Sequence, residues 1–216
     1  MTDADRVSSA TRRLKLFPLS RSVLFPGAVL PLHIFEPRYR ELVEDALATD
    51  SIFAMARPLP AAAGEPVPLE PVVCAGIIGE SQKLEDGRFN LVLLGVMRAR
   101  IERELPQVKL YREVEATPLP DAPYSGPLTL HLRQALLQLV PSLPPDVAAW
   151  MSRVAAAREG GELADLGASA VVVDARRNLV LDELRVKQRL ELVLEDVGAL
   201  LARLGASGPP TGGYKN

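Results

Sequence analysis

Prolines at positions 18, 26, 31 and 37 interrupt the apolar stretch 16–39 and limit what it can form. Because proline has no backbone N–H and a fixed φ, neither a helix interior nor a central strand accommodates it. Short edge strands, turns and the first turn of a helix do. We therefore expect a strand ending near Leu19, a turn at 25–27, a strand over 29–35 and a helix entered at Glu36. This pattern is typical of the frame of a small β-rich domain.

The residues after Pro37 follow a helical period. One apolar stripe repeats at i, i+3, i+4, i+7 and i+8, which predicts an amphipathic helix packed on the sheet. The stripe consists of Tyr39, Leu42, Val43, Ala46 and Leu47. The carboxylate of Glu36, just before the helix, is expected to cap it.

Short apolar or alternating runs then predict the remaining strands of an N-terminal lobe over 13–118. These runs cover 52–56, 72–78, 90–94, 98–103 and 109–116, and Asp86-Gly87 is a strong hairpin signal between two of them. The lobe should contain about six or seven strands and one helix. Residues 1–12 are expected to be a disordered lead. The proline-rich loop 58–71 is long enough to be functional or mobile.

The pattern changes at 119–127, a segment rich in proline, and we place a linker there. Beyond it the apolar period becomes helical and predicts an all-α lobe over 128–205. We expect Gly160-Gly161 to end the second of its helices and Gly205 to end the last, with a disordered tail over 206–216. The predicted fold class is α+β.

Composition excludes several function classes. The net charge is −2, so nothing attracts a polyanion by bulk charge, and the arginines at 98, 100 and 103 are interleaved with glutamates. Cys74 is the only cysteine, and His33 and His131 are the only histidines, so we expect neither a metal site nor a cofactor. No signal peptide or membrane-spanning run is present, which favours a cytoplasmic protein without membrane contact.

Taken together, three groups of residues resemble the N-terminal substrate-binding (LON) domain of the ATP-dependent Lon proteases, in a free-standing bacterial form. The first group is Phe17-Pro18-Leu19, Leu24-Phe25-Pro26-Gly27, Leu30-Pro31-Leu32 and Phe35-Glu36-Pro37-Arg38-Tyr39. The second is the strand ending at Gly95 with Arg98-Ala99-Arg100-Ile101, and the third contains Arg177-Asn178 and Arg189-Leu190. The resemblance implies a PUA-like β lobe followed by a helical bundle, and a role in protein binding.

The sequence lacks the signatures of the other Lon modules. The glycine-rich phosphate-binding motif ending in Gly-Lys-Ser/Thr is absent, and so is any segment resembling the Ser–Lys protease module. We therefore expect a non-enzymatic chain with no catalytic residues.

The leading hypothesis is a module that binds unfolded or extended polypeptides, or a partner protein, through exposed apolar residues and a free sheet edge. Weak self-association is compatible with it, and nucleic acid is not an expected partner. The residues proposed for this binding are Phe35, Tyr39, Leu59, Val67 and Leu69. Two alternatives remain: small-molecule or RNA binding by the β lobe, and an unrecognised hydrolase with convergent titratable groups.

Overall fold

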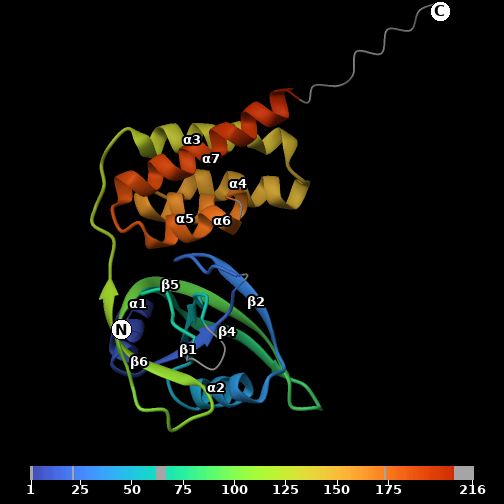
Figure 1. The fold of residues 1–216 in the computed structure, drawn as a ribbon. Coiled ribbons are helices and arrows are strands. Elements are labelled where there is room, and N and C mark those ends of the chain that lie inside the picture. Colours follow the sequence, from blue (N-terminus) through green and yellow to red (C-terminus); the bar gives the residue numbers. More distant parts are fainter. Residues whose placement is uncertain (1, 21, 62–66, 173, 207–216) are drawn as a thin grey trace, which may run out of the picture.

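The chain folds into a β lobe followed by a helical lobe (Figure 1), as the α+β prediction requires. The computed structural model describes residues 2–20, 22–61, 67–172 and 174–206. The β lobe contains β1 (Leu14–Pro18), β2 (Val29–Ile34), α2 (Pro37–Ala48), β3 (Ile52–Ala56), β4 (Val72–Lys83), β5 (Phe89–Glu104) and β6 (Arg112–Leu119). The helical lobe contains α3 (Leu128–Leu139), η2 (Val140–Ser142), α4 (Pro145–Ala157), α5 (Gly160–Val171), α6 (Asp174–Asp182) and α7 (Val186–Ala206).

The long strand β5 organises the β lobe because it pairs with three other strands. Its first half pairs antiparallel with β2, its second half pairs antiparallel with β6, and β4 runs along its other edge. The parallel pairing of β1 with β3, and the pairing of β1 with β6, close β1, β3, β4, β5 and β6 into a barrel. Among the described strands, β2 pairs only with β5, and it forms one margin of the lobe (Figure 1).

The prolines occupy the places that their backbone chemistry allows. Pro18 is the last residue of β1, Pro31 lies in the edge strand β2, and Pro37 is the first residue of α2. The predicted turn at 25–27 is present, and Gly27 has the positive φ of 78° that favours glycine. The predicted hairpin is also confirmed: β4 and β5 are joined by a turn in which Gly87 has a φ of 80°.

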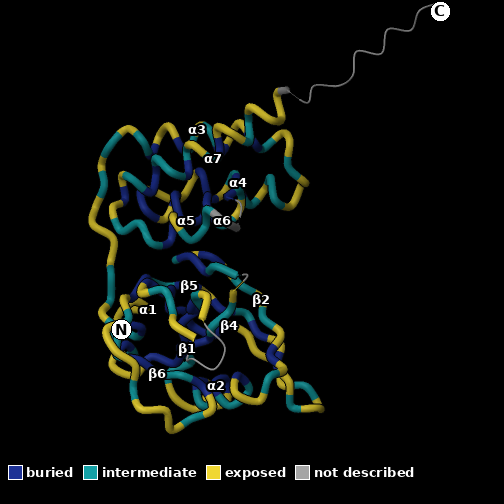
Figure 2. The backbone as a smooth tube through the Cα atoms, in the orientation of Figure 1, coloured by how far each residue is buried: buried dark blue, intermediate teal, exposed yellow. Residues whose placement is uncertain are grey.

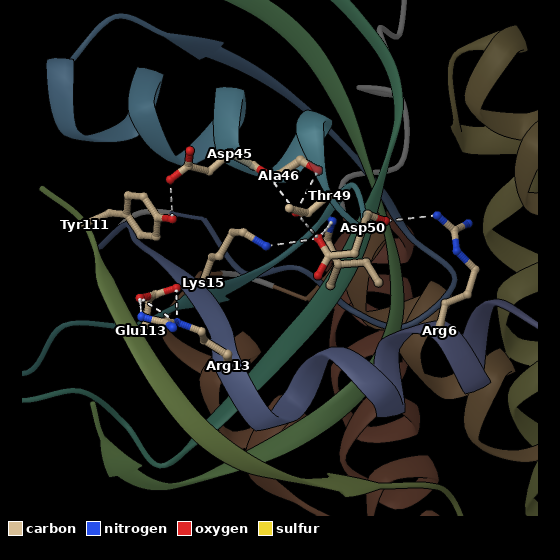
Figure 3. A network of polar contacts seen from close by, with 10 residues as sticks. Arg6, Arg13, Lys15, Asp45, Ala46, Thr49, Asp50, Tyr111 and Glu113 are labelled. Carbon is tan, nitrogen blue, oxygen red and sulfur yellow. Dashed lines mark hydrogen bonds and ion pairs between the residues drawn. The ribbon is translucent and has the colours of Figure 1, made fainter. Parts of the chain in front are cut away.

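The prediction of a disordered lead over residues 1–12 is wrong for the described residues 2–12. Residues Asp3–Ala10 form α1, which Thr2 and Asp5 cap reciprocally, and η1 (Thr11–Arg13) follows. Val7 is fully buried against the barrel, and the Arg6 guanidinium donates to the Asp50 carbonyl at 3.0 Å. Figure 3 shows Asp50 held from its other side by Lys15, whose Nζ lies 3.0 Å from Oδ1. The contacts of Val7 and Arg6 with residues outside α1 hold this helix against the barrel.

The helical lobe packs around α7, whose residues Val186, Leu190, Val193 and Val197 are buried. Figure 2 shows the buried residues concentrated on the inward sides of the helices and inside the barrel. Two predicted helix ends are wrong. Gly160 begins α5 rather than ending α4, because its φ of 48° lets the chain reverse there. Helix α7 continues through Gly205 to Ala206, and the rest of the predicted tail lies outside the described residues.

A buried network of charged side chains joins the two lobes. Arg98 of β5 donates two hydrogen bonds of 2.7 Å to the Asp165 carboxylate of α5, and a third of 2.8 Å to the Leu181 carbonyl. Arg189 of α7 contacts Asp165 at 3.2 Å and is also paired with Asp121, which precedes the helical lobe. Arg98, Asp165 and Arg189 are each 1 % exposed or less. Since a buried charge without a partner is costly, this network fixes one arrangement of the lobes.

Candidate polypeptide-binding surfaces

The first candidate surface is a hollow of about 500 Å³ on the outer face of β2, β5 and β4, which we call the β2 hollow. It forms because alternate residues of the three strands point outward. Pro31 and Val92 lie opposite each other in its floor, and His33 pairs with Asn90 through a contact of 2.7 Å between Nδ1 and Oδ1. Glu80 and Gln82 add a polar side from β4. The hollow therefore combines an apolar floor with a polar border.

Exposed apolar side chains lie at both ends of this hollow. Val29 and Leu94 are paired across the strands and are 59 % and 39 % exposed. Phe35, 60 % exposed, lies at the opposite end, where its ring stacks on that of His33 with centroids 6.2 Å apart. Exposed apolar side chains grouped in this way are a recognised feature of interaction sites.

A smaller hollow of about 240 Å³ lies where β2 begins, between the two lobes. Val29 and Leu30 form one side of it, and Trp150 of α4 and Ser169 of α5 form the other. Strand β2 thus borders two hollows in succession, one at each end.

The second candidate surface, which we call the Tyr39 groove, consists of two adjoining hollows of about 380 and 530 Å³. Pro18, Arg38, Tyr39, Val67 and Arg112 line both hollows. Arg112 is paired with Glu104 and donates to the Val67 carbonyl at 2.7 Å, so it connects β6 to the segment before β4. The groove lies between α2, the end of β1 and the segments that precede β4 and β6.

The charges around this groove are compensated locally. Glu36 precedes α2 as predicted, but its carboxylate makes no cap: it accepts from Arg38, with a shortest contact of 2.8 Å. Arg38 lies over the Tyr39 ring at 4.5 Å from the centroid. Burial raises the pKa of Tyr39, so its hydroxyl stays protonated and donates to the Pro18 carbonyl at 3.2 Å. Nearby, the hydrogen bond from Lys109 lowers the pKa of Asp45.

The structure distributes the five predicted binding residues over three places. Tyr39, Leu59 and Val67 line the Tyr39 groove, although Tyr39 itself is 5 % exposed and Val67 43 %. Phe35 lies beside the β2 hollow instead. Leu69 pairs with Pro58 in an isolated bridge at the base of the 58–71 loop, whose residues 62–66 lie outside the described part. A binding role for these five residues stays a prediction.

The exposure of Val29 and Leu94 was not predicted from the sequence. The run 90–94 contains Leu91, Val92, Leu93 and Leu94 and suggests a strand buried on both faces. In the structure only Leu91 and Leu93 of this run are buried, because β5 has the core on one face and solvent on the other. Asn90 at the start of the run was the one local signal of that alternation.

The basic strip considered for nucleic acid does not form. Arg98 is buried in the network between the lobes, and Arg103 is paired with Glu115 across the strands. Of the three, Arg100 is exposed, and it has no acidic ion-pair partner among the described residues. Consecutive arginines of β5 therefore face different surroundings, which removes the contiguous positive surface that phosphate binding would use.

The structure also describes the surroundings of the cysteine and of the side chains that could bind a metal ion. Cys74 is fully buried in β4, where burial raises the pKa of its thiol to about 12. Within the described ranges, no three side chains of the His, Cys, Asp and Glu types lie close enough together to hold a metal ion. None of the described helices combines the length and the apolar character that a membrane crossing requires.

Known proteins that are similar to this chain in sequence include Lon proteases. The chain is 32 % identical over 210 residues to Lon protease 2 of Sorangium cellulosum and 31 % identical over 195 residues to Lon protease of Roseiflexus castenholzii. These matches cover 86 % and 84 % of the chain, but only 24 % and 23 % of the relatives. The chain thus spans about a quarter of the length of these relatives.

Solved structures share the fold. The N-terminal domain of a Mycobacterium avium complex Lon protease matches 86 % of the chain with a TM-score of 0.69 at 17 % identity. A Lon N-terminal domain protein from Xanthomonas campestris matches 85 % with a TM-score of 0.59 at 24 % identity. The family described as the ATP-dependent protease La (LON) substrate-binding domain matches residues 13–197, which include both lobes. The chain therefore belongs to the LON substrate-binding domain family.

Proposed function

We propose that this chain is a non-catalytic module that binds unfolded or extended polypeptides on the surface along β2. The observation that carries the proposal is the grouping of Val29, Leu94 and Phe35 around the β2 hollow, at the margin of the sheet. An unfolded chain exposes apolar side chains together with unpaired backbone groups. A surface with an apolar floor and a polar border offers partners to both.

The family supports this proposal, because it is named for substrate binding and its match includes both lobes. The sequence supports the absence of catalysis, because it contains neither the phosphate-binding motif nor a Ser–Lys protease module. The absence of a continuous basic strip on β5 argues against nucleic acid as the ligand. The proposed partner is accordingly a polypeptide, and the proposed location is the cytoplasm.

The test is fluorescence anisotropy with a permanently unfolded polypeptide, reduced and carboxymethylated α-lactalbumin, as the labelled probe. Two variants carry the same substitution at comparably exposed valines: Val29→Lys beside the β2 hollow and Val67→Lys in the Tyr39 groove. Both side chains are exposed, so neither change should disturb folding, which circular dichroism would verify.

We expect wild-type protein and Val67→Lys to bind the probe with similar affinity. Val29→Lys should bind about tenfold more weakly, because a charge then lies in the apolar contact. Loss of binding in Val67→Lys alone would assign the site to the Tyr39 groove. Absence of binding by the folded wild-type protein would refute the proposed function itself.

A further inference from the structure

The backbone of β2 shows which of its groups remain unpaired. The Gly95 N–H donates to the Ala28 carbonyl at 2.9 Å, and Val29 lies opposite Leu94. In an antiparallel ladder the direction of the backbone groups alternates along a strand. The N–H and C=O groups of Leu30, Leu32 and Ile34 therefore point to β5. Those of Val29, Pro31 and His33 point away from it.

The outward groups have no partner among the described residues. These groups are the N–H and C=O of Val29, the C=O of Pro31 and the N–H and C=O of His33. Proline lacks an N–H, so Pro31 occupies an outward position without weakening the ladder with β5. A row of unpaired donors and acceptors along an exposed edge is a template for another extended chain.

We infer that the bound polypeptide adds to β2 as a further β-strand, paired with Val29, Pro31 and His33. This inference rests on the proposed function and specifies its mode. An antiparallel ligand strand would exchange two hydrogen bonds with Val29, two with His33, and would donate one to the Pro31 carbonyl. Only alternate residues of the ligand would use their backbone groups, so alternate N–H groups are essential and the others are not.

The hollow beside Trp150 specifies one side chain of the ligand. Ligand residues adjacent to Leu30 point to the opposite face from those paired with Val29, because side chains alternate along a strand. That face at the start of β2 borders the hollow of about 240 Å³, where Leu24, Leu30 and Trp150 supply apolar surface beside the polar Ser169 and Arg177. A ligand side chain at this position would pack on Leu30 and Trp150 with its end near these polar groups.

A second copy of this chain fits the same edge poorly. If two β2 strands paired over their full length, Val29 of one copy would lie opposite His33 of the other. Pro31 would then lie opposite Pro31 of the second copy, and neither residue could donate a hydrogen bond at the centre of the pairing. The edge therefore favours a heterologous strand with an N–H at its centre.

The experiment measures amide hydrogen exchange by nuclear magnetic resonance, with and without saturating carboxymethylated α-lactalbumin. We expect exchange at Val29 and His33 to slow by about tenfold or more when the polypeptide binds. The amides of Leu30 and Leu32, already bonded to β5, serve as internal controls and should change little. Unchanged exchange at Val29 and His33, with binding confirmed by anisotropy, would refute strand addition and leave the proposed function intact. Slow exchange at both residues in the free protein, together with a dimeric mass, would assign the edge to a second copy.

A variant that gains a hydrogen bond provides an independent test. Pro31→Val restores an outward N–H at the centre of the edge without altering the ladder with β5. Because one hydrogen bond is added to the complex, binding of the unfolded polypeptide should tighten by about three- to tenfold. Pro31→Val should also remove the obstacle to pairing between copies, which sedimentation would detect as concentration-dependent dimers. Unchanged affinity and mass in a folded Pro31→Val protein would contradict the inference.

Discussion

Replacing Arg98 by methionine should strongly destabilise the protein, because Arg98 lies at the centre of the network that joins the lobes. The side chain is 1 % exposed and makes two hydrogen bonds of 2.7 Å to Asp165, with a third of 2.8 Å to the Leu181 carbonyl. In Arg98→Met, Asp165 keeps only the contact from Arg189 at 3.2 Å. Breaking a buried ion pair of this kind costs about 3–5 kcal/mol.

The matched control is Arg103→Met, the same substitution in the same strand. The Arg103 side chain is 61 % exposed, and its pair with Glu115 lies on the surface. An exposed ion pair contributes about 0–1 kcal/mol, so this variant should unfold close to the wild type. The two variants differ in burial and in the carbonyl partners of Arg98, which isolates the buried network as the cause.

Urea unfolding followed by far-ultraviolet circular dichroism and by Trp150 fluorescence measures the effect. The hydrophobic core is continuous between the lobes, so both probes should report one transition in the wild type. With a denaturant slope of about 2–3 kcal/mol per M, Arg98→Met should lower the midpoint by about 1–2.5 M. A loss below about 1 kcal/mol, or a loss equal to that of Arg103→Met, would refute the role assigned to the network.

Three further predictions concern the fold. Gly95→Ala should lower the free energy of unfolding by about 3 kcal/mol or more in chemical denaturation, because a Cβ there would lie 2.1 Å from a backbone carbonyl oxygen. The control is Gly198→Ala, where a Cβ would meet nothing within 4 Å, and this variant should be neutral or stabilised by up to ~1 kcal/mol. Val7→Ala should lower the free energy of unfolding by roughly 2 kcal/mol, because Val7 is fully buried. An unchanged free energy of unfolding would show that α1 does not pack on the barrel. Asp45→Asn tests the pH dependence of stability. The hydrogen bond from Lys109 lowers the pKa of Asp45 in the folded protein below its usual 3.8. The carboxylate therefore stabilises the fold above pH 3.8, and this stabilisation is lost as the pH falls through the pKa of the folded state. The difference in melting temperature between wild type and Asp45→Asn should therefore shrink as the pH falls from about 5 to about 2, and a constant difference would contradict this assignment.

The frame of the β lobe could be predicted from sequence because its constraints are local. Proline at 31 and 37 permits few backbone states, and the Asp86-Gly87 pair specifies a turn by its own conformational preference. The apolar stripe of α2 needs only the helical period to be recognised. Such signals lie within a few residues of the element that they specify.

The features that were missed depend on contacts between distant residues. The capping pair Thr2 and Asp5 is a local signal for helix α1, but the helix carries only one buried apolar residue, Val7, and Arg6 is bonded to the distant Asp50, so no apolar stripe indicated an ordered helix. Nothing local distinguishes the buried Arg98 from the exposed Arg100, because the partner that allows burial lies 67 residues further along the chain.

The candidate binding surface was predictable only in part. Exposed apolar residues and a free sheet edge were expected, and Phe35 lies beside the β2 hollow. Which edge stays open depends on the pairing of β5 with both β2 and β6, and neighbouring residues do not encode that pairing. The exposure of Val29 and Leu94 follows from the same long-range topology.

The central claim, that a polypeptide binds along β2, is tested most directly by mapping amide chemical shifts during titration with carboxymethylated α-lactalbumin. We predict that the largest changes lie at Val29, His33 and Leu94, with the amides of Val67 and Leu110 in the Tyr39 groove unaffected. Changes concentrated at Val67 and Leu110, with none along β2, would contradict the account.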